Sequence, residues 1–88
     1  MNNALRAILI SMFNKRIIGG SHTPENKLIV SKTKWLNKKE INQFEKEYKQ
    51  IINNKIIIRL KKRTKKSSDW HISLNPKKLK ELSELLEL

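Results

Sequence analysis

The stretch KKEINQFEKEYKQIINNKIIIRLKK, residues 38–62, changes its hydrophobic period partway along its length. The first part repeats apolar residues at helical spacing and predicts a helix over 38–53. Its apolar stripe is Ile41, Phe44, Tyr48, Ile51 and Ile52. Asn37 and Glu40 resemble a capping box at the start, and Asn53–Asn54 suits the end. From residue 56 onward apolar and polar residues alternate, which predicts a strand directly after the helix.

A second alternating run follows after a polar loop, so the strand has a partner. The two runs predict a β-hairpin over about 55–75, with an apolar inner face and a basic outer face. The residues expected on the inner face are Ile56, Ile58, Leu60, Trp70, Ile72 and Leu74.

Three further helices are predicted around this core. The first spans about 4–18 and is stopped by Gly19–Gly20, because glycine accepts the left-handed conformation of a helix end. The second spans about 24–34, and the fourth spans about 76–87 after Asn75 as its cap. The chain is therefore expected to be one domain, residues 1–88, of the α+β class and mainly helical.

The charge balance points to a polyanionic partner. Twenty Lys and Arg face eight Asp and Glu, a net charge of +12, and so large an excess strains a small fold by self-repulsion. Cysteine is absent, so the sequence excludes disulfides and thiolate metal sites. We find no secretory signal pattern and no apolar run of spanning length. These observations predict an intracellular, cytoplasmic protein with no membrane partner.

The outer face of the predicted helix 38–53 is uniformly basic or amide-bearing. Lysine attracts phosphates, and the amides of Asn and Gln can read an adenine edge. The three acids of this helix, Glu40, Glu45 and Glu47, are expected on its flanks. The alternative is an ordinary solvated face, although such faces usually mix charges of both signs. The predicted recognition residues are Lys39, Asn42, Gln43, Lys46, Lys49 and Gln50.

The hairpin and the start of the last helix add further positive charge. The predicted phosphate contacts of the hairpin are Arg59, Lys61, Lys62, Arg63, Lys65 and Lys66. Control of edge-to-edge aggregation is the alternative explanation for these charges. Lys77 and Lys78 stand at the positive end of the last helix, an unfavourable place for lysine unless a phosphate sits there. We therefore predict a phosphate seat at these two residues, with solvent screening as the alternative.

Helix, helix, helix and hairpin with this charge placement resembles the winged-helix family, especially small Lys-rich members from archaea and their mobile elements. The resemblance covers about residues 24–75 and rests on element order and charge, together with the wing-like stretch from Lys61 to Pro76. It implies a winged helix-turn-helix fold in which helix 38–53 enters the major groove of DNA. The turn Trp35-Leu36-Asn37 departs from the family because it has no glycine.

No catalytic or cofactor-binding motif accompanies these features. The only histidines are His22 and His71, and we find no metal-ligand spacing, phosphate loop or nucleophile elbow. The sequence thus predicts a non-enzymatic protein without a cofactor or metal. Trp35 and Trp70 could stack on bases, but both occupy positions expected to face the core.

Double-stranded DNA is the predicted partner, for a transcriptional regulator or an architectural protein. An RNA-binding module is the first alternative, because composition does not separate the two nucleic acids. A protein-interaction adaptor that docks through the Leu-rich last helix is the second. Leu85 and Leu88 extend the apolar surface of that helix beyond its core stripe, which predicts a homodimer interface.

Overall fold

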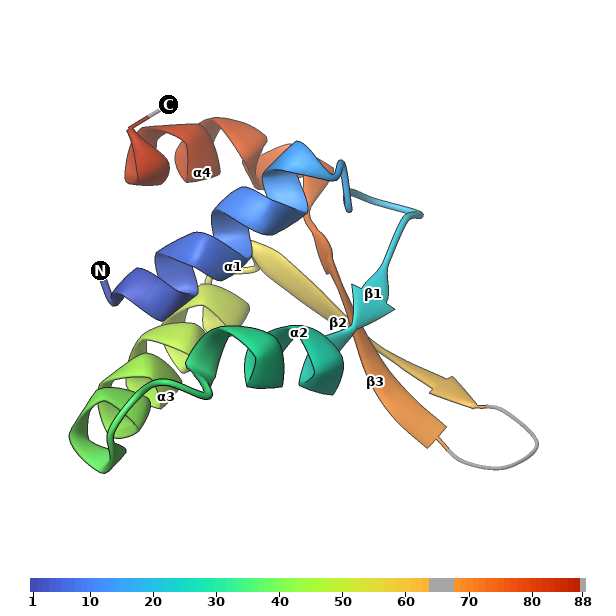
Figure 1. The fold of residues 1–88 in the computed structure, drawn as a ribbon. Coiled ribbons are helices and arrows are strands. Elements are labelled where there is room, and N and C mark those ends of the chain that lie inside the picture. The colour runs from blue at the N-terminus through green and yellow to red at the C-terminus, as the bar shows by residue number, and fades with distance from the viewer. Residues whose placement is uncertain (64–67, 88) are drawn as a thin grey trace.

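The helices of this α+β domain pack against a three-stranded antiparallel sheet with strand order β1–β3–β2 (Figure 1). The computed structural model describes residues 1–63 and 68–87. The elements are α1 (Asn3–Asn14), β1 (Thr23–Pro24), α2 (Glu25–Thr33), α3 (Lys38–Asn53), β2 (Ile57–Arg63), β3 (Ser68–Leu74), the 3₁₀ turn η1 (Pro76–Lys78) and α4 (Leu79–Leu86). No helix among the described residues is long and apolar enough to cross a bilayer.

Helix α1 lies at the centre of the core, and its C-terminal end differs from the prediction. Asn2 caps the start, but the helix ends at Asn14 rather than near residue 18. Arg16 adopts the left-handed conformation (φ 55°), and the Ile17 N–H donates to the Met12 carbonyl. The predicted glycine stop was therefore wrong. The following residues instead run beside β3, where the Leu74 N–H donates to the Ile17 carbonyl.

In the β2–β3 hairpin, the side chains of β2 that face the core are not the ones predicted: the two faces of this strand are exchanged. Ile57 lies opposite Leu74, and Lys61 lies opposite Trp70. Directly opposed residues share a sheet face, so Ile57, not Ile58, faces the core with Leu74. Ile58 and Leu60 lie on the other face, and Leu60 is exposed. Consecutive isoleucines at 56–58 satisfy either phase, which explains the error.

The remaining boundaries are close to the prediction. Helix α3 has the predicted bounds and the complete Asn37–Glu40 capping box. Thr23–Pro24 forms a short strand on β3 instead of opening α2. The last helix begins as the 3₁₀ turn η1 and continues as α4, which closes the core. The buried apolar side chains are Ala4, Leu5, Ile8, Leu9, Met12, Phe44, Ile51, Ile56, Ile57, Ile72, Leu74, Leu82 and Leu86.

Candidate nucleic-acid interface

The outer face of α3 is exposed along its whole length. Phe44 and Ile51 anchor the opposite side of the helix in the core, which fixes its rotation. All six predicted recognition residues lie in solvent: Lys39, Asn42, Gln43, Lys46, Lys49 and Gln50. Asn42, Lys46 and Lys49 line one shallow hollow together with Glu45. The structure therefore brings half of this predicted set together in the hollow, but it also places one acid, Glu45, among the lysines.

The two glutamines stand on the flank of α3 that faces α1 and α4. The Gln43 side chain donates to Glu47 Oε2 at 3.0 Å, and Glu47 Oε1 accepts from the Asn2 backbone N–H at 2.9 Å. Gln50 lines the groove that also contains Leu85. Asn42 has no such internal partner among the described residues and sits nearer the middle of the outer face. Asn42 is thus the amide best placed to read a base.

A buried carboxylate joins α3 to the hairpin. Glu25, the first residue of α2, is 9% exposed. Its Oε2 accepts a hydrogen bond from the Tyr48 hydroxyl at 2.6 Å, and its Oε1 accepts from the Arg59 guanidinium at 2.8 Å. The sequence predicts Arg59 as a phosphate contact of the hairpin, and for Glu25 it predicts only the favourable helix-dipole interaction of an acid in a first turn. The structure instead uses both in an internal contact between α2, α3 and β2.

The same contact changes the acidity of Tyr48. Burial of the ring, and then the hydrogen bond to Glu25, raise the pKa of the Tyr48 hydroxyl far above its ordinary value. A folded-state pKa above the unfolded one adds stability below the unfolded pKa, and this stability is lost as the pH rises beyond it. The raised pKa of Tyr48 therefore predicts that the fold loses stability in alkali.

We expect the free energy of unfolding to fall as the pH rises above about 10, because the unfolded tyrosine ionises while folded Tyr48 stays protonated. Tyr48 is the single tyrosine of the chain, so the absorbance of tyrosinate reports this group alone. Tyrosinate should appear together with the loss of helical circular dichroism. In Tyr48→Phe, the alkaline fall in stability should be smaller than in the wild type. Ionisation with an ordinary pKa in the folded protein would contradict the contact.

The hairpin carries an exposed aromatic residue beside its cations. Trp70 is 43% exposed, so its prediction as a core residue was wrong. The Arg59 guanidinium lies 4.3 Å from the centre of the Trp70 ring, and Lys61 Nζ lies 5.8 Å from it. Lys61 is exposed on the face of β2 that also carries Arg59. Lys62 and Arg63 belong to β2, while Lys65 and Lys66 lie outside the described residues.

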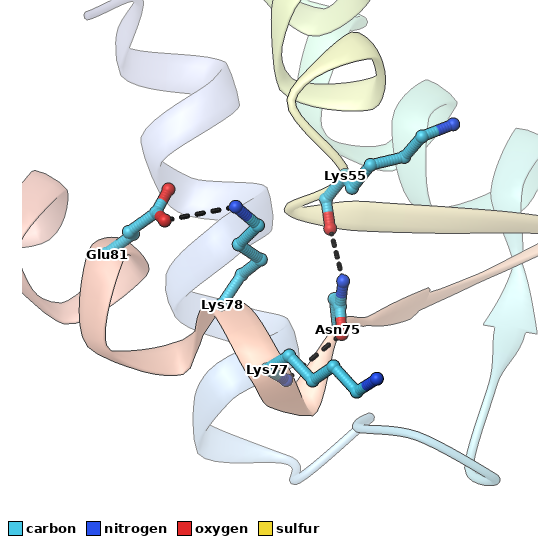
Figure 2. A network of polar contacts seen from close by, with 5 residues as sticks. All are labelled: Lys55, Asn75, Lys77, Lys78 and Glu81. Carbon is cyan, nitrogen blue, oxygen red and sulfur yellow. Dashed lines mark hydrogen bonds and ion pairs between the residues drawn. The ribbon is translucent and has the colours of Figure 1, made fainter.

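The predicted phosphate seat at the start of the last helix is partly occupied by the protein itself. The Asn75 side chain accepts from the Lys77 N–H at 3.0 Å, and the Lys78 ammonium pairs with Glu81 at 3.1 Å. Figure 2 shows Lys78 reaching back to Glu81 while the Lys77 side chain points away from it. These residues follow Leu74, the last residue of β3, whereas Ser68 is at the other end of that strand (Figure 1). The Asn75 side chain also donates to the Lys55 carbonyl, just after α3, at 2.9 Å, but among the described residues no hydrogen bond or ion pair joins Lys77 or Lys78 to the outer face of α3.

Leu85, one of the two residues predicted at a dimer interface, is 43% exposed. It lines a groove of about 410 Å³ between α1, α3 and α4, together with Leu5 and Ile56. Leu88, the other residue, lies outside the described residues. The stripe of Leu79, Leu82 and Leu86 covers the core as expected. The homodimer itself stays a prediction.

The two histidines bond to each other rather than to a carboxylate. His22 Nδ1 and His71 Nδ1 are 2.8 Å apart, and their rings meet edge to face. The described residues contain no group of three or more side chains of the metal-binding types. Comparisons with known protein families, with characterised proteins and with solved structures give no match to this chain.

Proposed function

We propose that this protein binds double-stranded DNA as a winged-helix domain, with α3 in the major groove and the β2–β3 hairpin as the wing. The observation that carries the proposal is the exposed outer face of α3, which presents Lys39 and, around one shallow hollow, Asn42, Lys46 and Lys49 with Glu45. None of these lysines has an ion-pair partner in the part of the chain that the structure describes. Their charge is therefore available to a ligand.

The element order supports the winged-helix assignment. Three helices precede a hairpin, as the family resemblance requires. Between α1 and α2 in the chain, β1 adds a short third strand to the sheet. The helix after the turn would enter the groove and the hairpin would lie along the adjacent backbone. Lys61 and the positive residues that follow it would then contact phosphates, while Asn42 would contact a base edge.

DNA is favoured over RNA by the shape of the proposed reading element. A helix fits the wide major groove of B-form DNA, whereas side chains cannot read the deep and narrow major groove of A-form RNA. We infer a non-enzymatic role as a transcriptional regulator or an architectural protein. Competition with an RNA duplex of matched sequence tests this preference, and tighter binding to the RNA would reverse it.

We expect binding to duplex DNA to be strongly salt-dependent. If about five phosphates are neutralised, log K should fall against log salt with a slope of about −4 to −5. Fluorescence anisotropy with a labelled duplex at several salt concentrations measures this slope. A slope near zero, or no binding at low salt, would overturn the proposed function.

A further inference from the structure

Trp35 is the most exposed large apolar residue that the structure describes. It lies in the turn between α2 and α3 and is 83% exposed, so its prediction as a core residue was also wrong. The turn is closed by a hydrogen bond from the Leu36 N–H to the Thr33 carbonyl. Half-buried Leu36 packs against the core in place of the tryptophan. The ring therefore projects into solvent from a hydrogen-bonded turn.

The surroundings of Trp35 select an anionic ligand. Residues 26–39 contain no acid, and their five lysines are all exposed: Lys27, Lys32, Lys34, Lys38 and Lys39. The ammonium of Lys34 lies 5.2 Å from the centre of the Trp35 ring. No ion pair involves these lysines within residues 1–63 and 68–87. Glu40 is the nearest acid along the chain, and its carboxylate accepts from the Asn37 N–H. An apolar ring beside an exposed lysine, in a lysine-rich stretch of chain, matches a ligand that carries both phosphates and flat apolar surfaces.

We propose that Trp35 stacks on an unpaired nucleotide next to the duplex held by α3, so that the preferred ligand is a junction between duplex and single strand. Inside a duplex, both faces of each base are covered by its neighbours, so a ring outside the helix can stack only on an unpaired base or on the open face of a terminal base pair. Base–aromatic stacking of this kind is tolerant of sequence. Trp35 lies two residues before the Asn37 cap, at the start of the helix proposed to enter the groove.

Trp70 is less suited to this role. Arg59 already lies over its ring, and Glu25 holds that guanidinium in place. The cation near the Trp35 ring is the terminal ammonium of Lys34, an exposed lysine that can move aside. The two tryptophans therefore differ in the ring surface that a base could cover.

The test compares three ligands with the same double-stranded part: a blunt duplex, the duplex with a short single-stranded tail, and the duplex with an abasic tail. The abasic tail has the same phosphates without bases. Wild-type protein should bind the tailed duplex about five- to 150-fold more tightly than the abasic one. Trp35→Phe should keep part of this preference. Trp35→Leu, which keeps an apolar side chain without a ring, should lose the preference and still bind the blunt duplex.

The inference rests on the proposed function, but its failure is distinguishable. Absence of binding to the blunt duplex would contradict duplex binding itself. Equal affinity for the tailed and abasic ligands, or an unchanged preference in Trp35→Leu, would overturn the stacking role and leave duplex binding intact. Tryptophan emission provides a second readout in the Trp70→Phe background, where Trp35 is the only tryptophan. It should be quenched by the tailed duplex and not by the abasic one.

Discussion

The double substitution Lys46→Ala/Lys49→Ala should weaken binding to duplex DNA about 25-fold near physiological salt. Both side chains are exposed in the hollow that also contains Asn42. Each lysine–phosphate contact makes the slope of log K against log salt more negative by about 0.9, which corresponds to about fivefold in affinity at about 0.15 M salt. Anisotropy titrations should therefore also give a slope about 2 less negative than that of the wild type.

The matched control removes the same charge from another part of the protein. Lys15, after the end of α1, and Lys80, on α4, are both exposed. Lys15→Ala/Lys80→Ala lowers the net charge equally, and we expect it to change the affinity and the slope much less. Equal losses in the two double variants would mean that overall charge, rather than the α3 face, attracts the DNA.

Replacing Glu25 with alanine should lower the free energy of unfolding by about 2–3 kcal/mol. The substitution removes one hydrogen bond from Tyr48 and one charged hydrogen bond from Arg59. The Arg59 side chain is 36% exposed, so solvent screens part of the ionic contribution and the lower half of the usual range applies. Urea unfolding followed by circular dichroism measures the loss.

Two control variants test whether the loss of stability in Glu25→Ala comes from this contact. Glu25→Gln keeps a hydrogen-bonding side chain without the charge, and it should lose less stability than Glu25→Ala. Glu84→Ala removes an exposed acid on α4 and should change stability by no more than about 0.5 kcal/mol. If Glu25→Ala and Glu84→Ala behaved alike, the contact of Glu25 with Tyr48 and Arg59 would not stabilise the fold.

Local signals were sufficient for α3. Its apolar stripe, the Asn37–Glu40 box and the paired asparagines at its end all agree, and the predicted bounds match the structure. The exposure of its outer face follows from the same periodicity, because fixing one side of a helix in the core leaves the opposite side in solvent. The exposed outer face of α3 is thus the part of the candidate site that the sequence predicts best.

Other features depend on contacts between distant residues. The end of α1 is decided by the pairing of Ile17 with Leu74, which outweighs the glycine signal two residues later. The phase of β2 is set by its register with β3, because three consecutive isoleucines allow either phase. Trp35 reaches solvent because Leu36 takes the place against the core. None of these outcomes can be read from local spacing.

Glu25 illustrates the same limit at the candidate site. Its position at the start of α2 predicts a favourable interaction with the helix dipole, which any exposed acid could make. Its actual partners are 23 and 34 residues away. An acid in a strongly basic chain could pair with many residues, so composition alone does not reveal which cation it holds.

The contact of Glu25 with Tyr48 and Arg59 also has a consequence for the entropy of binding. It ties α3 to the base of the hairpin in the free protein, so these two parts of the proposed interface are already in their relative positions when DNA arrives. Little conformational freedom between them is then lost on docking, and the ordering cost falls mainly on side chains. Glu25→Ala should therefore make the association entropy less favourable, even under conditions in which the variant is fully folded.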